Sequence, residues 1–594
     1  MQAGATTRVE RIAFAALAAL VFVYVAARAV LVPVIHDEAM TFFVYVETGN
    51  FLPFRAHWDA GNHLLCTALA WLGWSAFGFS AWALRLPSVL AFILYTAYAW
   101  KWGTRLHGPM VRWGLWAALL GMPFLLDLFS LFRGYGLAMA FWSMALYEGC
   151  SLLEKRSTKR LLLVLLASAC AAFSSLSLLT LWAAVLAVTL FVALRKPVQR
   201  GMLAGWLLLG AFPFTFAAAY AYQLGLRGAL YYGTDTGMFR GTVPSLLKAM
   251  FGGSNMLAVA VVVLITVAGI VVAWRAFRER DRSFGAWALI GTAGLVWADV
   301  LGRELLFAWN GTLFPEDRTA LQWVLLFVLL FAFALDRLAK TAPRLKWLAL
   351  GLLLLPLRTL STANLRTTSF WPEQAIPSSI FRAAEREQQV SPRLLTIGAY
   401  HQMPACWGFG LRQRGLALNA VDVSAFPNGG EALLLIDPHR DSVPSDYRAV
   451  ELAPGGHIAL YARETPVNTT LLLDTTFTGE RSDAEYKELW HPAIGTVRGG
   501  TFLVELEMAL RPDREPMTGD FVLETNAGGT VQHTDHVLFQ FMRDPPRSDS
   551  IRTVRHIPHV PMDAERVVVY LWNPSLQWYA CSGRMRIYLV RDGA

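Results

Sequence analysis

Apolar runs long enough to cross a membrane recur through the first 360 residues of this chain, and they constrain its fold most strongly. A helix needs about 20 mainly apolar residues to cross the hydrocarbon core of a bilayer. Inside lipid a helix satisfies all its own backbone hydrogen bonds, so runs of this length predict spanning helices. We predict about eleven of them, near residues 12–34, 80–100, 109–127, 134–150, 161–176, 178–194, 201–220, 255–273, 284–301, 319–336 and 346–361.

Two of the apolar runs are unusual in length: the first run of the chain and the stretch 161–195. The first run follows Arg8 and Arg11 and reaches Val34, which exceeds the roughly 7–15 apolar residues of a signal peptide. We therefore expect an uncleaved first helix. The stretch 161–195 is too long for a single span, and the serines at 174, 175 and 177 mark the expected break.

The composition changes after Phe370. The whole chain is 16% charged with a mean hydropathy of +0.41, whereas the last third has the mixture of a water-soluble protein. An amphipathic helix is predicted at Ala375–Gln389, followed by short alternating or β-branched runs that predict strands. These runs are 394–397, 433–436, 457–461, 501–509, 521–525, 537–541, 567–572 and 585–590.

The predicted fold is therefore a polytopic α-helical membrane protein with a mainly-β soluble domain at its C-terminal end. We expect a transmembrane domain over residues 1–365, a small α/β segment over 366–465 and a β-sandwich-like domain over 466–594. The five cysteines form no metal-binding spacing, and Cys406 and Cys581 of the soluble part are expected as single buried thiols, although they could pair after export.

Positive charge is concentrated in alternate loops between the apolar runs. These loops share a side with the N-terminus, and positively charged loops face the cytoplasm. With an odd number of spans, everything after about residue 360 is expected outside the cytoplasm of a plasma (inner) membrane protein. The net charge of +9 is thus an orientation signal, and we expect no nucleic-acid partner because no basic, aromatic-interleaved face is present.

Adjacent acids follow the first predicted helix, in the sequence His36-Asp37-Glu38. Neighbouring residues on a helix point about 100° apart, so one carboxylate would face a substrate and the other would orient it or anchor the loop. A carboxylate at this place can act as a general base toward a hydroxyl or amine. The alternative is a pair of acids that only starts a helix.

The same loop continues with closely spaced polar side chains that could line a sugar-binding cavity. His36, Asp59 and His63 could also supply metal ligands, although an ordinary interfacial loop would look similar. The candidates for a substrate cavity are His36, His57, Asp59, Asn62 and His63.

Isolated arginines stand at the ends of other apolar runs. Arg133 is followed directly by Gly134 and Tyr135. Its guanidinium could hold a phosphate, or the side chain could snorkel to the membrane–water interface. Arg318 follows two acids that look like a helix cap, yet a cation in a first helical turn opposes the helix dipole. We predict Arg133, Arg318 and Tyr135 as donor-phosphate-binding residues, and Arg303 as a weaker cavity candidate.

Four short motifs occur in order along the chain: 36–39 (HDEA), 77–80 (FGFS) with 85–88 (RLPS), 132–135 (FRGY) and 315–320 (PEDRTA). In this order they resemble the GT-C superfamily of polyprenyl-phosphate-sugar-dependent glycosyltransferases, which includes protein O-mannosyltransferases and the lipid A aminoarabinose transferase. The resemblance covers about residues 11–360 and leaves out the soluble domain.

The resemblance implies an inverting transfer of a hexosyl or pentosyl group from a polyprenyl-phosphate donor on the outer face of the membrane. It implies Asp37 as the catalytic acid/base with Glu38 assisting. The resemblance does not identify the acceptor, because it leaves out the soluble domain; a lipid, glycan or protein acceptor is expected. No cofactor is implied with certainty, and a divalent metal remains open because some members use one.

Two other classes of protein fit part of this pattern. A transporter or flippase of lipid-linked sugars would also need polar cavities and arginines in the membrane, and inverted repeats, which this sequence lacks, would favour it. A membrane receptor or scaffold with a carbohydrate-binding β-domain would not depend on Asp37.

Overall fold

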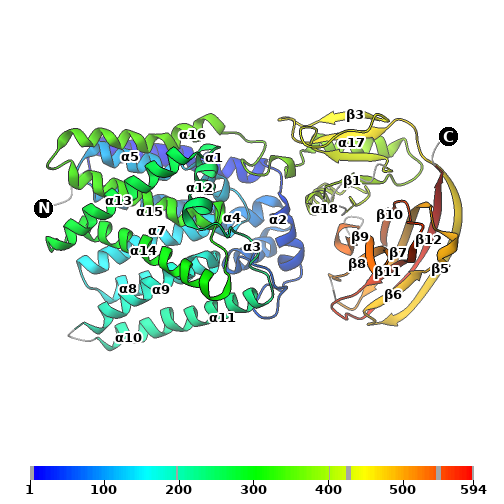
Figure 1. The fold of residues 1–594 in the computed structure, drawn as a ribbon, viewed down its shortest axis with the longest axis horizontal. Helices are drawn as coiled ribbons and strands as arrows, with labels where there is room; N and C mark the ends of the chain where they lie inside the picture. The colour runs from blue at the N-terminus through cyan, green and yellow to red at the C-terminus, as the bar shows by residue number, and fades with distance from the viewer. Residues whose placement is uncertain are drawn as a thin grey trace. The chain divides into compact units, whose positions relative to one another are not determined.

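The structure is a computed structural model that describes residues 6–195, 199–400, 402–422, 430–514, 516–542 and 550–591. The chain divides into two compact units (Figure 1). The first unit comprises Met1–Leu31 and Gly49–Leu365, and the second comprises Val32–Thr48 and Arg366–Ala594. The second unit therefore takes in a short segment from near the N-terminus.

The first unit is helical, and nine helices of its described residues are long and apolar enough to span a membrane. They are α1 (Arg8–Leu31), α4 (Ala81–Thr104), α7 (Gly134–Glu154), Leu176–Leu194 containing α9 (Leu179–Leu194), Arg200–Leu226 containing α10 (Arg200–Trp206) and α11 (Phe212–Leu226), α13 (Met256–Arg278), α14 (Phe284–Asn310), Asp317–Leu338 containing α15 (Leu321–Leu338), and Pro343–Thr362 ending in α16 (Leu354–Thr362).

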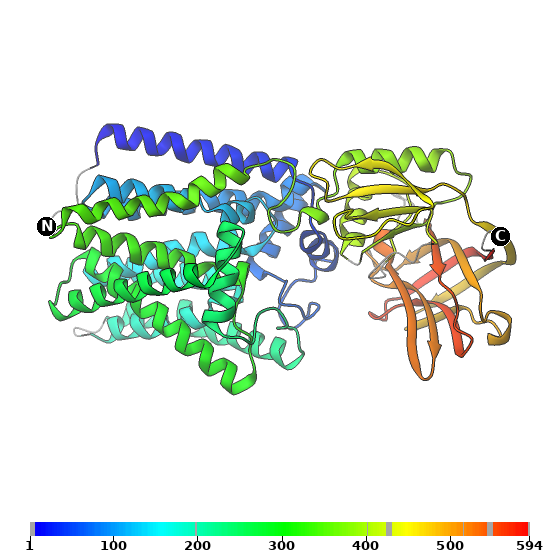
Figure 2. The same ribbon diagram turned by 45° about the horizontal axis from the view of Figure 1, so that its top comes forward.

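The remaining predicted spans are helical too, with local differences. α5 (Pro109–Leu120) and α6 (Pro123–Phe129) form a pair bent by 49°, which makes a tenth span if counted together. α8 (Thr158–Ser174) has 17 residues and ends where the break was predicted. There Ser175 is extended, with φ −155° and ψ 109°, before a 3₁₀ turn (Leu176–Leu178) leads into α9. α8, α9 and α10 lie side by side (Figures 1 and 2).

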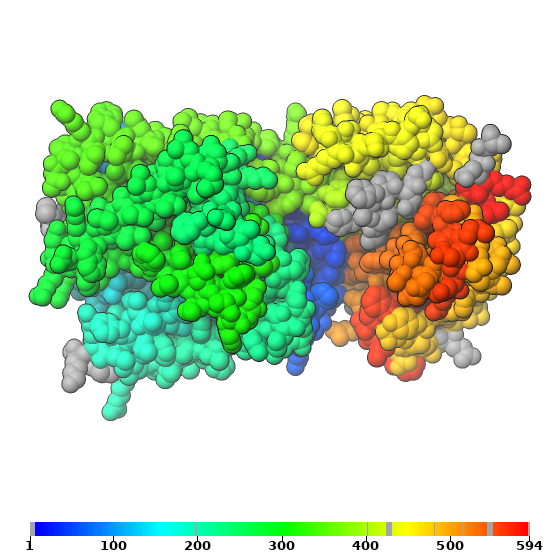
Figure 3. All heavy atoms as spheres, viewed as in Figure 1, coloured from blue at the N-terminus to red at the C-terminus, as the bar shows by residue number. Residues whose placement is uncertain are grey.

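Local sequence explains where these helices start and stop. α13 begins after Asn255, whose side-chain oxygen accepts a hydrogen bond from the Ala258 N–H at 2.8 Å. It ends with Arg275 and Arg278 in its last turn, where cations complement the helix dipole. Leu20, Leu264 and other apolar side chains are exposed on this unit, as expected of surfaces that face lipid. Figure 3 draws all heavy atoms as spheres, coloured by position along the chain.

Two further helices of the first unit were not among the predicted spans. α3 (Leu64–Phe77) is a shorter apolar helix, and α12 (Val243–Phe251) lies in the long loop before α13. Both help to arrange the loops that carry the candidate residues.

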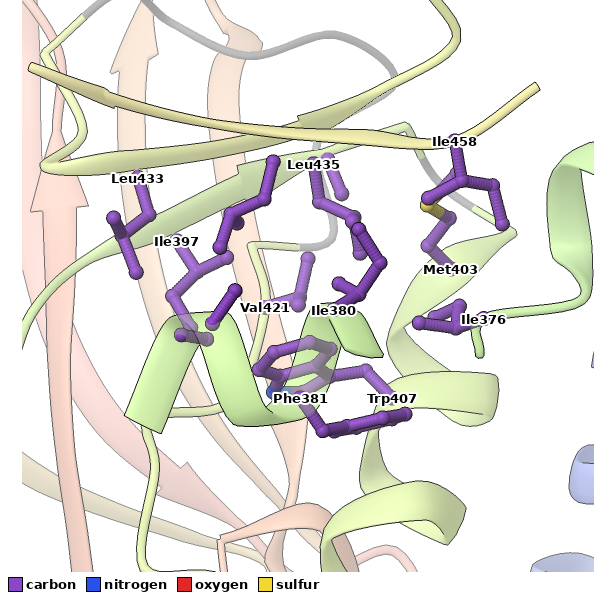
Figure 4. Packing of buried hydrophobic residues seen from close by; sticks show 14 of the residues in the cluster. Ile376, Ile380, Phe381, Ile397, Met403, Trp407, Val421, Leu433, Leu435 and Ile458 are labelled. Atoms are coloured by element: carbon purple, nitrogen blue, oxygen red, sulfur yellow. The ribbon is translucent and has the colours of Figure 1, made fainter. Parts of the chain in front are cut away.

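The second unit contains a mixed sheet with the strand order β1-β2-β4-β3. β1 and β2 are parallel, and the other pairs are antiparallel. Phe381 and Trp407 stack below this sheet, with ring centroids 4.7 Å apart (Figure 4). They share a core with Ile397 of β1 and with Leu433 and Leu435 of β2. The elements are α17 (Ser378–Gln389), β1 (Ile397–Ala399), α18 (Met403–Arg414), β2 (Leu433–Ile436), β3 (Tyr447–Leu452) and β4 (Ala459–Arg463).

The rest of the second unit consists of two four-stranded antiparallel sheets, with strand orders β10-β7-β12-β5 and β6-β11-β8-β9. Their strands are β5 (Asn468–Ser482), β6 (Tyr486–Trp490), β7 (Thr501–Pro512), β8 (Asp520–Ala527), β9 (Thr530–Leu538), β10 (Ser550–Ile557), β11 (Ala564–Trp572) and β12 (Tyr579–Arg591). All five cysteines are free, Cys406 in α18 and Cys581 in β12 included.

The chain is thus a polytopic α-helical protein of membrane-spanning composition with a mainly-β C-terminal part, as the sequence predicts. The domain boundaries at residues 365 and 465 stay predictions. One departure matters for function: the segment Val32–Thr48, which carries the acidic motif, folds into the second unit with α2 (His36–Thr41) and a π-helical turn, η1 (Phe42–Val46).

Candidate functional site

Asp37 and Glu38 occupy the first turn of α2, where acids favour the helix dipole. The Glu38 side chain folds back, and its Oε2 accepts a hydrogen bond from the Ile35 N–H at 3.2 Å. Glu38 is buried, with 1% of its surface exposed, whereas Asp37 is half-buried. The two adjacent carboxylates therefore have different surroundings, and Glu38 ties down the helix start.

His36 fastens the same turn to the rest of the second unit. Its backbone N–H donates to Gln374 Oε1 at 3.1 Å, and its ring Nδ1 lies 2.9 Å from the Gln402 carbonyl oxygen. Because a carbonyl only accepts, Nδ1 carries the proton in this contact. Gln374 in turn donates from Nε2 to Gln402 Oε1 at 2.7 Å. Through backbone and side-chain groups, His36, Gln374 and Gln402 thus form one set of connected hydrogen bonds at the start of α2.

The surroundings of α2 are negatively charged. Burial raises the pKa of the Cys406 thiol well above its usual value, and the carboxylates of Glu38 and Asp37 raise that pKa further. Burial also raises the pKa of Tyr400, with Glu373 as the second cause. Cys406 therefore stays a protonated thiol. Both acids of the motif, Glu38 and Asp37, influence it electrostatically.

Arg133 and Tyr135 meet His63 in the first unit. Arg133 is the N-cap residue of α7, with 5% of its surface exposed, and its guanidinium carbon lies 5.9 Å from the centre of the Tyr135 ring. The His63 ring packs edge-on against Tyr135 at 4.6 Å, and its Nδ1 lies 2.8 Å from the Ser174 carbonyl oxygen. Gly134 permits this approach, since a Cβ there would stand 2.0 Å from the Ser174 oxygen.

Arg318 lies in a 3₁₀ turn, η5 (Asp317–Ala320), just before α15, and not in the first turn of an α-helix as the sequence predicts. Its guanidinium carbon stands 4.2 Å above the centre of the Tyr232 ring. The Tyr232 hydroxyl donates a hydrogen bond to Asp317, whose φ of +34° is unusual for a residue other than glycine. Strained backbone of this kind is often held in place at functional sites.

Tyr232 is influenced electrostatically by residues of both arginine-bearing loops. Burial raises the pKa of Tyr232, Arg318 lowers it, and Asp317 and Tyr135 raise it. Arg133 and His63 adjoin Tyr135, and Arg318 adjoins Tyr232. Tyr232 was not predicted from the sequence, where its signal is a pair of tyrosines in a long loop between two spans.

The other polar residues of the first long loop shape the loop itself. Asn62 donates to the Phe51 carbonyl oxygen at 3.0 Å, and Asp59 accepts from the Gly61 N–H. Trp58 lies between His57 and Asp59 in the sequence, and its ring is stacked with that of Tyr220 and covered by the Arg227 guanidinium. The His57 side chain is exposed. Among the predicted cavity residues on this loop, His63 packs against Tyr135, two residues after Arg133.

Arg303 forms an ion pair inside the helical unit. Its Nε lies 3.3 Å from Asp299 Oδ1, one turn earlier in α14, and its Nη2 donates to the Ser177 carbonyl oxygen. Asp299 is completely buried and also accepts from Trp323 Nε1 at 2.7 Å and from Thr180. These contacts give Arg303 a role in holding α14 to its neighbours, because a buried charge needs such partners.

A second buried ion pair was not predicted. Arg28 of α1 lies 2.7 Å from Asp127 of α6, and both are buried. Arg85 of α4, also buried, donates to the Ala29 carbonyl oxygen at 3.1 Å. An arginine inside an apolar run was the available signal for Arg28, but its partner cannot be read from spacing.

Metal ligands do not gather in the part of the chain that the structure describes: no group of three or more His, Cys, Asp and Glu side chains there could hold an ion. His36 belongs to the second unit and His63 and Asp59 to the first. The common cavity predicted for Asp37, Arg133 and Arg318 stays a prediction, because Asp37 belongs to one unit and the arginines to the other.

No protein-family model and no curated protein matches the chain. Among solved structures, ArnT from Cupriavidus metallidurans bound to undecaprenyl phosphate is 15% identical, with a TM-score of 0.38, over 77% of this chain and 98% of that one. ArnT in the apo state is 14% identical, with a TM-score of 0.36, over 76% and 97%.

The arabinosyltransferase EmbB from Mycobacterium smegmatis is 12% identical, with a TM-score of 0.33, over 96% of this chain and 64% of that one.

Proposed function

We propose that this protein is a membrane glycosyltransferase of the GT-C type that takes its sugar from a polyprenyl-phosphate carrier. Support for the proposal comes from two arginines on loops far apart in the sequence of a membrane-spanning helical unit: Arg133 lies beside the Tyr135 ring and Arg318 over the Tyr232 ring. Charged side chains near the hydrocarbon boundary are costly unless they serve a partner. A phosphate on a lipid is a partner that two planar guanidiniums fit.

The reaction would be a single displacement on the extracytoplasmic face. Asp37 takes the proton of an acceptor hydroxyl or amine while that atom bonds to C1 of a hexosyl or pentosyl group. The bond between C1 and the phosphate oxygen breaks in the same step, and its electron pair leaves with the polyprenyl phosphate. Attack opposite the leaving group inverts the configuration at C1.

The roles of the other residues follow from their contacts. Arg133 and Arg318 would stabilise the charge that develops on the departing phosphate. Glu38 would hold the start of α2 through its bond to the Ile35 N–H, which keeps its neighbour Asp37 in place. The acceptor is a lipid, a glycan or a protein.

Substitution of Asp37 tests the proposal. Asp37→Asn keeps the shape of the side chain and removes its basicity, so transfer should fall about 10²–10⁴-fold with a purified lipid-linked sugar donor. Glu38→Gln should be much milder, because an amide oxygen can still accept from the Ile35 N–H. Transfer by Asp37→Asn at the wild-type rate would remove Asp37 from the mechanism, and lipid movement without transfer would favour a flippase.

A further inference from the structure

We propose that the C-terminal unit holds the catalytic segment in place, and that Gln374 and Gln402 are positioning residues for Asp37. The inference rests on the proposed function for the role of Asp37 itself. It assigns a task to a unit that the superfamily resemblance leaves out. The evidence is a set of contacts at both ends of the segment Val32–Thr48, all of them within the second unit.

The first anchor lies at the start of α2. Gln374 accepts from the His36 N–H at 3.1 Å, and the Gln402 carbonyl oxygen faces the His36 ring at 2.9 Å. The bond from Gln374 Nε2 to Gln402 Oε1, at 2.7 Å, fixes the orientation of both amides. Gln374 is buried, so its hydrogen bonds are made away from water. The residue immediately before Asp37 is thereby held through its backbone and its ring.

The second anchor lies at the end of the segment. Gln540 donates from Nε2 to the Phe43 carbonyl oxygen at 3.0 Å and to Glu47 Oε2 at 2.9 Å. Arg412 of α18 forms an ion pair with the other oxygen of Glu47. Glu47 and Gln540 are both buried. A carboxylate paired in this way is costly to expose or to leave without its partners.

Aromatic packing joins the two anchors. Phe43 stands edge-on to Phe541, with ring centroids 4.9 Å apart, and Phe42 stands edge-on to Phe409 of α18 at 5.6 Å. Both Phe42 and Phe43 are fully buried in the π-helical turn η1. The segment Val32–Thr48 is therefore packed into the C-terminal unit and is not merely a loop that connects two helices.

This arrangement matters because catalytic geometry tolerates little error. A base that moves by about 1 Å from its productive position can lose on the order of 100-fold in rate. Asp37 sits on a six-residue helix, which is too short to be stable alone. The rigidity of that helix must therefore come from the surrounding unit, and the glutamine pair holds the residue immediately before Asp37.

Gln374→Met in the full-length protein tests the inference, because methionine keeps the length of the side chain and removes both hydrogen bonds. We expect kcat to fall about tenfold or more with the KM for the lipid donor unchanged. Backbone amides of residues 36–41 should exchange hydrogen faster, as measured by mass spectrometry. A merely structural loss would lower stability without these two effects.

Gln388→Met is the matched control. Gln388 also donates to a backbone carbonyl, that of Arg393, at 2.7 Å and accepts from a backbone N–H, that of Leu395, at 3.0 Å. It lies at the end of α17, and both of these partners lie outside the segment Val32–Thr48. We expect wild-type kcat and wild-type exchange at residues 36–41 in this variant.

The outcomes separate the two proposals. Unchanged exchange at residues 36–41 together with wild-type kcat in Gln374→Met overturns the positioning role. If instead Asp37→Asn keeps full activity, the proposed function fails, while faster exchange in Gln374→Met still shows that this unit holds the segment. Should Gln374→Met not fold, Gln540→Met at the second anchor is read in the same way, with exchange followed over residues 42–47.

Discussion

Asp37 and Glu38 carry the same chemical group, and their neighbours decide what each can do. Glu38 is buried and bonded to the Ile35 N–H, whereas Asp37 is half-buried one residue away. The sequence predicts that one of two adjacent acids anchors the loop, because their side chains diverge on a helix. It does not say which, since both orders look alike until the helix start is known.

The two arginines of the first unit should bind phosphate through their planar shape and not through charge alone. Arg133→Lys and Arg318→Lys keep the charge and lose the two-point grip, so each should raise the apparent KM for the lipid donor about tenfold. Arg227→Lys is the control, because Arg227 also covers an aromatic ring, that of Trp58, at 4.0 Å, and is not among the predicted phosphate-binding residues. If Arg133→Lys and Arg318→Lys both keep the wild-type KM for the donor, these arginines do not bind the phosphate.

His556 of β10 should make the second unit sensitive to acid. Burial, with His533 as the second cause, lowers the pKa of His556 from 6.5 to about 4. A histidine whose pKa is depressed in the folded state binds protons better when unfolded, so stability is present above pH 6.5 and is lost as the pH falls toward 4.

This effect can be isolated by substitution. Between pH 7 and pH 5 the His556 contribution should fall by roughly 2 kcal/mol, at about 1.36 kcal/mol per pH unit. His556→Phe keeps a ring against Gly430 and removes the titration, so its melting temperature should change less between these two pH values. An equal shift in the variant and the wild type, measured by thermal unfolding, would assign the acid sensitivity to other groups.

Among the elements, α7 depends on a close approach at its first residue. A Cβ on Gly134 would meet the Ser174 carbonyl oxygen at 2.0 Å and His63 at 2.7 Å. Gly134→Ala should therefore destabilise the protein by about 1–3 kcal/mol and raise the donor KM, because Arg133 and Tyr135 move with the helix start.

A second glycine of the same helix provides the comparison. Among the described residues, no heavy atom lies within 4 Å of the position that a Cβ on Gly149 would take. Gly149→Ala should therefore be neutral or stabilising by up to about 1 kcal/mol. Thermal unfolding and donor titration of both variants give the test. Equal behaviour of the two would mean that the contact of α7 with Ser174 does not position the arginine.

Elements with strong periodicity were predicted and those with weak signals were not. β2 occupies Leu433–Ile436, as predicted, because four consecutive apolar β-formers have few alternatives. α18 was missed, since its twelve residues include two glycines and a mixture of polar and apolar side chains. β5 was missed because it is threonine-rich and polar, and β12 on one side supplies its hydrogen bonds.

At the scale of the whole molecule, orientation in the membrane is the prediction to test. A reporter that is active only after export should be active when it is fused after Ala594. The same reporter inserted after Thr341, in a loop rich in positive charge, should be inactive. Activity at Thr341, or its absence at Ala594, would mean that the number of spans is even.

The membrane-spanning helices were determined by the sequence alone, because transfer into lipid depends on the length and apolarity of a run and hardly on its neighbours. Tertiary structure decided the partners of the buried charges, such as Arg28 with Asp127 and Arg303 with Asp299. It also decided that the segment carrying Asp37 belongs to the C-terminal unit. Hydrogen bonds such as that from His36 to Gln374 join residues more than 300 positions apart, and no local pattern in the sequence specifies such a pairing.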